Sequence, residues 1–137
     1  MTRIKYDINL MGYISLFESL TLTKLKDCIV NKQIIFIVQE NQIAKAIGKN
    51  GSNVRRLEKI LNKKVKIVEF NPDIIRFIKN FIYPIKPKDI NKEDYTITIM
   101  GSDTKTKGML IGRESQNLKI LKEIVRRYFK VEDIKVV

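Results

Sequence analysis

The chain carries the stretch IGKNGSNVR at residues 47–55, and a related stretch, IGRESQNLK, follows at residues 111–119. Residue 111 lies 64 positions after residue 47, and the same offset pairs Phe17 with Phe81 and Leu57 with Leu121. Two unrelated basic, amphipathic helices could show such a likeness by chance. An offset that also aligns an upstream aromatic residue favours duplication of a whole module, and one duplication is too few copies for a solenoid.

The first half of the chain shows the periodicities of three helices and three strands. Ile14 and Phe17 lie at helical spacing, and Asn31-Lys32 suits a turn between two apolar runs. Asn41 and Ser52 are the expected N-caps of two helices, because their side chains can accept a first-turn amide. The predicted elements are a helix at about 7–20, strands at 26–30 and 33–39, helices at 41–47 and 52–61, and a strand at 65–70.

The second half repeats this order of elements. The pattern predicts a helix from Asn71 to about Tyr83, strands at 85–90 and 94–100, helices at 101–111 and 116–129, and a strand at 131–137. Each half therefore reads α-β-β-α-α-β, which is an α+β fold. We place the domains at residues 1–70 and 71–137, and because no Gly- or Ser-rich linker joins them, we expect the two to be closely packed.

The charge of the chain points to a polyanionic partner. Its 137 residues hold 27 Lys and Arg against 15 Asp and Glu, a formal net charge of +12. Such an excess suits nucleic acid or an anionic membrane, although solubility alone is a simpler explanation. The apolar run at 34–38 is far shorter than the roughly 20 residues of a membrane span, and residues 1–7 show no signal peptide.

The sequence gives little support for an enzyme. It has no histidine, the commonest general base, and no cluster of Cys and His for zinc, so we expect no catalysis, metal or cofactor. Cys28 is the single cysteine and lies among apolar residues, where a small buried hydrophobe is the expected role. A chain without disulfides suits a reducing compartment, which predicts a cytoplasmic protein.

The tetrapeptide Gly48-Lys49-Asn50-Gly51 between two helices is suited to hold a phosphate. Glycines permit a close backbone approach, and the following helix begins with unpaired amides at the positive end of its dipole. Upstream, Ile43, Ala44 and Ile47 form a small apolar floor for bases. The tetrapeptide alone could equally be an ordinary turn between helices. Its position after a hairpin and before a strand, twice over, is that of the KH clamp, which holds about four nucleotides of single-stranded RNA.

Several segments of the chain resemble archaeal-type NusA, a family of transcription termination and elongation factors. They are SLFESLT (15–21), KDCIV (26–30), AIGKNGSNV (46–54), KG (107–108), IGR (111–113) and VEDI (131–134). The resemblance covers nearly the whole chain. It implies two tandem type II KH domains, binding of single-stranded RNA, and a role at transcribing RNA polymerase.

The motif and its repeat give a set of candidate RNA-binding residues, contributed by both loops and the helices that follow them. These are Ile47, Gly48, Lys49, Asn50, Gly51, Asn53, Arg55, Arg56, Gly112, Arg113, Asn117 and Lys119. Two other classes of function stay open for such a fold: a protein-interaction module that has lost RNA binding, and a ribosome-associated KH protein.

The second loop, Gly112-Arg113-Glu114-Ser115, departs from the family pattern. A serine at the fourth position would lose roughly 1–2 kcal/mol in a left-handed conformation, and Glu114 places a negative charge where a phosphate would pass. The second site is therefore expected to be weak or reoriented toward Arg113, Lys119 and Lys122, and an ordinary turn that does not bind RNA is an equal alternative.

Overall fold

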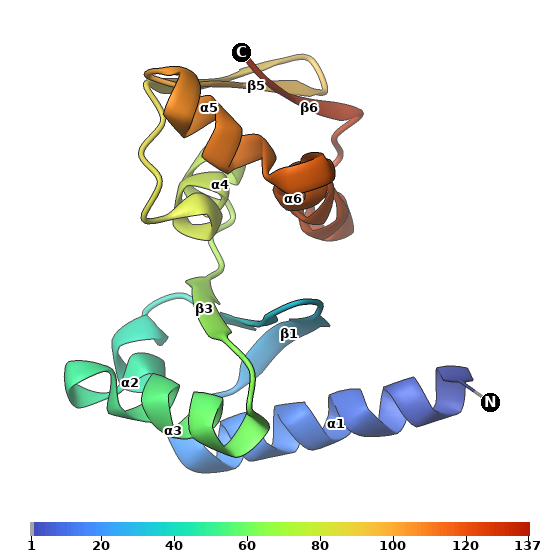
Figure 1. Cartoon of the computed structure of the whole chain (residues 1–137), viewed down its shortest axis with the longest axis vertical. Coiled ribbons are helices and arrows are strands. Elements are labelled where there is room, and N and C mark those ends of the chain that lie inside the picture. The colour runs from blue at the N-terminus through green and yellow to red at the C-terminus, as the bar shows by residue number, and fades with distance from the viewer. Residues whose placement is uncertain (1) are drawn as a thin grey trace. The chain divides into compact units, whose positions relative to one another are not determined.

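The computed structural model describes residues 2–137, with side chains from Leu10 onward. The chain forms two compact units, Met1–Asn71 and Pro72–Val137. In both units the elements run helix, strand, strand, helix, helix, strand, and a three-residue turn of 3₁₀ helix separates the last two helices. Figure 1 shows the three helices of each unit on the same side of its sheet. The predicted α+β fold, with the α-β-β-α-α-β order in each half, is confirmed.

The first unit contains α1 (Thr2–Thr21), β1 (Leu25–Val30), β2 (Ile34–Val38), α2 (Ile43–Ile47), α3 (Ser52–Leu61) and β3 (Val65–Glu69). Its sheet has the order β1-β2-β3, with β2 antiparallel to β1 and parallel to β3. All five residues of the central strand are buried. The rings of Phe17 and Phe36 stack at 4.4 Å, which anchors α1 to the sheet.

The second unit contains α4 (Ile74–Ile82), β4 (Asp89–Glu93), β5 (Thr96–Met100), α5 (Thr104–Ile111), α6 (Gln116–Tyr128) and β6 (Asp133–Val136). Its sheet repeats the first one: β5 lies between β4 and β6, antiparallel to β4 and parallel to β6. The central strand buries Ile97 and Ile99, and alternate residues of a strand share one face. Phe77 packs against Phe129 at 5.9 Å, which joins α4 to the end of α6.

Some predicted boundaries are wrong. The first strand of the second unit spans 89–93 instead of 85–90, because the prolines at 84 and 87 occupy the connection before it. Asn41 is not an N-cap: it has a left-handed backbone, and Gln42 precedes the helix without a side-chain cap. Ser52 is the first helical residue, and Gly51 precedes it as N-cap. The first helix also begins earlier than predicted, at Thr2.

Within the part of the chain that the structure describes, no helix combines the length and the apolar character needed to cross a membrane.

Candidate nucleic-acid interface

The first loop is a short, tightly folded connection between α2 and α3. Its 3₁₀ turn covers Lys49–Gly51. The Gly48 amide donates to the Ala44 carbonyl at 3.0 Å, and the Gly51 amide donates to the Gly48 carbonyl at 3.1 Å. Asn50 at φ 55° and Gly51 at φ 73° are both left-handed. These bonds and the two left-handed residues turn the chain sharply between the two helices.

Gly48 is required by its backbone and by its neighbours. Its φ of 79° and ψ of 167° fall in a region that essentially only glycine occupies. A Cβ at this position would lie 2.7 Å from the Ser52 Oγ, whereas a Cβ at Gly51 would meet only the Arg55 Nη1, at 3.4 Å. The first glycine of the loop is therefore sterically necessary, and the fourth position tolerates a side chain at the cost of a left-handed backbone alone.

The second loop keeps the backbone of the first. Gly112 has φ 76° and ψ 171°, Glu114 has φ 55° and ψ 32°, and Ser115 has φ 60° and ψ 21°. The Gly112 amide donates to the Gly108 carbonyl at 2.8 Å, and the Ser115 amide donates to the Gly112 carbonyl at 3.2 Å. The loop is thus not reoriented, although Ser115 takes up the left-handed strain that the sequence predicted.

Asn53 and Asn117 hold equivalent positions in the two units. The Asn53 side-chain amide donates to the Lys45 carbonyl at 3.2 Å, and the Asn117 amide donates to the Met109 carbonyl at 2.9 Å. Each bond ties the first turn of one helix to the last turn of the helix before the loop. The structure gives both residues this internal role, and their predicted contact with RNA stays a prediction.

The helices that follow the two loops begin without a side-chain cap. Neither α3 nor α6 has a side-chain hydrogen bond at its N-cap. By contrast, Asp73 accepts the Ile75 amide at the start of α4, and Asp103 accepts the Thr106 amide at the start of α5. Because uncapped first-turn amides carry a partial positive charge, α3 and α6 are suited to receive an anion.

The predicted cations of the first loop are exposed, but they differ in what they contact. Among the side chains that the structure describes, Lys49 and Arg56 form no ion pair with a carboxylate. The guanidinium of Arg55 instead donates to the Asn50 carbonyl of the loop itself. Arg55 therefore braces the loop tip, while Lys49 and Arg56 remain available to phosphates.

The three residues of the predicted apolar floor differ in their surroundings. Ile43 packs against the core of the first unit, whereas Ala44 is exposed and Ile47 is half-buried. Both α2 and α3 contact β3, an edge strand of the sheet. Contact between these three residues and a base stays a prediction.

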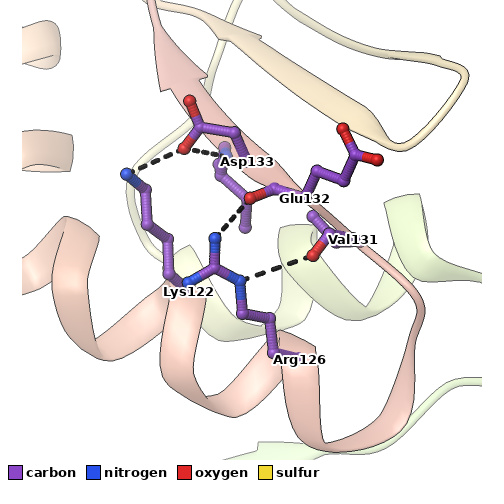
Figure 2. Close-up of polar contacts among 6 residues, drawn as sticks. Lys122, Arg126, Val131, Glu132 and Asp133 are labelled. Atoms are coloured by element: carbon purple, nitrogen blue, oxygen red, sulfur yellow. Dashed lines mark hydrogen bonds and ion pairs between the residues drawn. The ribbon is translucent and has the colours of Figure 1, made fainter.

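In the second unit, Arg113 and Lys119 are exposed, and so is the carboxylate of Glu114. Lys122, which a reoriented loop would have used, pairs instead with Asp133 at 2.9 Å. Figure 2 shows this pair beside Arg126, which donates to the carbonyls of Val131 and Glu132. The hydrogen bond from Lys122 is the main reason why the Asp133 pKa lies below its usual value. These contacts fasten α6 to the start of β6.

Cys28 is buried in β1, as the sequence predicted. Burial, helped by the negative charge of Asp27, raises the pKa of its thiol to about 12. Because the thiolate is the nucleophilic form, this cysteine is inert at neutral pH.

The sequence of the chain is similar to those of known proteins. The KH domain family matches residues 12–86 of the chain. A protein of Thermoplasma acidophilum named "Probable transcription termination protein NusA" is 30% identical over 140 residues, covering 99% of this chain and 97% of its own length. Proteins with the same name from Methanocaldococcus jannaschii and Methanococcus vannielii are 29% and 31% identical; the matches cover 100% and 98% of this chain and 77% and 80% of those proteins.

A solved structure shows the same fold. The crystal structure of APE1850 aligns with a TM-score of 0.70 and 28% sequence identity, covering 93% of this chain and 96% of that chain. The alignment therefore spans both units of the chain.

Proposed function

Because the chain belongs to the archaeal NusA family of KH-domain proteins, we propose that it is an RNA-binding transcription factor that holds single-stranded RNA at its first loop. One observation carries this proposal: a glycine-flanked loop leads into a helix whose first turn has no side-chain cap. Lys49 and Arg56 lie in the loop and the first part of that helix, and neither pairs with a carboxylate from Leu10 onward. A phosphate at this point would meet backbone amides, the positive end of the helix dipole and two cations.

The geometry favours a single strand over a duplex. A KH clamp holds about four unstacked nucleotides, with the backbone on the Gly-X-X-Gly loop. In this chain the exposed Ala44 and half-buried Ile47 leave only a narrow apolar surface beside the loop. Bases reach such a surface only when they are unpaired, so duplex RNA would offer its phosphates alone.

The second loop is proposed as the weaker of two sites. Its backbone can approach a phosphate in the same way, since the dihedral angles of the two loops agree closely. Its tip, however, carries Glu114 where the first loop has the neutral Asn50. The negative charge repels a phosphate and offsets the attraction of Arg113.

The name of the relatives places them in transcription termination. We propose the same setting for this chain, with nascent RNA as its ligand, RNA polymerase as a protein partner and no catalytic step of its own. Co-purification with polymerase would support this setting, whereas co-purification with ribosomes would favour a translational KH protein.

A titration of the full chain with single-stranded and duplex RNA of the same sequence, at several salt concentrations, tests the RNA-binding function. We expect tighter binding to the single strand and a log–log salt slope of about −0.7 for each phosphate neutralised. Affinity that is unchanged by salt, or equal for the duplex, would contradict the clamp, and no binding at all would favour a protein-interaction module.

A further inference from the structure

The second unit holds a cavity outside both loops. It has a volume of about 290 Å³ and lies where the chain leaves α4 and enters β4. Figure 1 draws this segment in yellow, between α4 and the sheet of the same unit. The volume is near the lower end of the range for ligand pockets, roughly 300–1,000 Å³. It therefore suits one small group rather than an extended ligand.

Three lysines line this cavity: Lys79, Lys86 and Lys88. All three are exposed, and none forms an ion pair with any carboxylate whose side chain the structure describes. Asp89 is the one acidic residue of the lining. The cavity thus carries a net positive charge that no ion pair with a described carboxylate neutralises, which is the property of an anion site.

The other lining residues are apolar or aromatic. Ile85 and Pro87 are half-buried, while Tyr83 is 66% exposed and makes no ring contact within the described chain. The Ile85 amide donates to the Ile82 carbonyl and the Lys88 amide to the Met100 carbonyl, at 2.9 and 2.7 Å. These two bonds fix both ends of residues 85–88. The backbone that carries Lys86 and Lys88 is therefore held in place next to Tyr83.

We propose that this cavity, here called the lysine–tyrosine pocket, binds one nucleotide of a single-stranded RNA, with the base against Tyr83 and the phosphate among Lys79, Lys86 and Lys88. Aromatic faces accept any base by stacking, and lysines bind phosphate as point charges. A site that held only an anion would not need an exposed aromatic ring. The proposal rests on the RNA-binding function proposed above and adds a contact outside the two loops.

Two variants of the full chain test the lysines and the tyrosine of the pocket separately, and a third variant is the conservative control. Lys86→Gln/Lys88→Gln removes two charges, and Tyr83→Ala removes the ring, whereas Tyr83→Phe keeps it. The probes are single-stranded RNAs of about six and about sixteen nucleotides, because the loop alone holds about four. We expect each of the first two variants to bind the long RNA about tenfold more weakly and the short RNA unchanged, with Tyr83→Phe close to wild type.

A matched control is Lys24→Gln/Lys92→Gln, which loses the same charge at two exposed lysines that do not line the pocket. An equal loss of affinity in this control would reduce the effect to net charge and overturn the proposal. Long-RNA affinity that matches wild type in both pocket variants would also overturn it and leave the loop-based function standing. A wild-type protein that binds neither RNA would remove the proposed function and this pocket together.

A second measurement distinguishes a nucleotide from a bare anion. The tyrosine ring resonances of the full chain are followed by NMR during titration with uridine monophosphate or with inorganic phosphate, and Tyr83→Phe identifies the signal. Larger shifts with the nucleotide support the pocket as a nucleotide site. Equal shifts with phosphate alone would show an anion site without base recognition and would overturn the proposal.

Discussion

Glycine is favoured at the first and at the fourth position of the Gly-X-X-Gly motif for different physical reasons. At the first position, Gly48 and Gly112 share a backbone that essentially only glycine adopts, and a Cβ on Gly112 would lie 2.6 Å from the Cγ of Asn117. At the fourth position, Gly51 is merely left-handed, and Ser115 holds the same conformation in the other unit. The first glycine makes room for the asparagine that braces the loop, and the fourth lowers strain.

This difference predicts unequal effects of alanine at the two glycines. Gly48→Ala should lower the free energy of unfolding by roughly 3 kcal/mol, because it adds a steric clash to a forbidden backbone conformation. Gly51→Ala should lower the free energy of unfolding by about 1 kcal/mol, since the only cost is a left-handed backbone for a residue with a Cβ. Denaturant unfolding of both variants measures the difference. Equal effects would show that the asparagine and Ser52 move aside at no cost.

At the scale of the elements, hydrophobic periodicity predicted the bounds of a helix or strand well wherever one face of it is buried. The helix of residues 116–128 and the strand of residues 96–100 lie close to their predicted positions, because their apolar residues recur at helical or alternating spacing. The strand at 89–93 was misplaced because it buries only Ile90 and leaves little pattern to detect. The offset of 64 residues would have predicted this strand correctly, because it places the first strand of the first unit, residues 25–30, onto residues 89–94.

In the candidate site, too, the sequence predicts some features and misses others. Sequence placed the two loops correctly, because each lies between two helices whose apolar spacing is recognisable and because the motif occurs twice at one offset. It could not show that Arg55 binds the loop tip or that Asn53 and Asn117 bind the helix before each loop, since those bonds depend on how the two flanking helices meet. Nor did it indicate Tyr83 and the lysines beside it, although prolines, lysines and a tyrosine within residues 79–88 are a detectable signal.

Helix α5 carries a titratable cap, which predicts a pH dependence of stability. The pKa of Asp103 is lowered, first by the backbone amide of Thr106 and then by its hydroxyl, so the folded state favours the carboxylate. This contribution is present above the unfolded pKa of about 4 and disappears as the pH falls through the lower folded value. Asp103→Asn, which keeps the cap but loses the charge, should be less stable than wild type at pH 7, and the gap should close in acid.

Thermal unfolding from pH 7 down to about pH 3 measures this gap. Glu93→Gln, which removes a charge from an exposed residue of the same unit, serves as the control. A difference between Asp103→Asn and wild type that persists unchanged in acid would contradict an electrostatic role for the cap.

At the scale of the whole molecule, the two units share their loop geometry and differ in the charge at the loop tip. Both loops present an uncapped helix on the same backbone, and the overall charge of +12 draws RNA toward either unit. The tip reads Lys49-Asn50 in the first unit and Arg113-Glu114 in the second. Since geometry does not separate the two proposed sites, charge is the property that we expect to rank them.

The most direct test of this account compares Lys49→Asp with Arg113→Asp. The two positions are equivalent and exposed, and each variant changes the net charge by the same amount. Titration of the full chain with single-stranded RNA, with circular dichroism to confirm folding, should show a loss of about tenfold or more for Lys49→Asp. The loss for Arg113→Asp should be clearly smaller, because Glu114 already weakens that site. A larger loss for Arg113→Asp would place the main RNA site in the second unit and contradict the central claim.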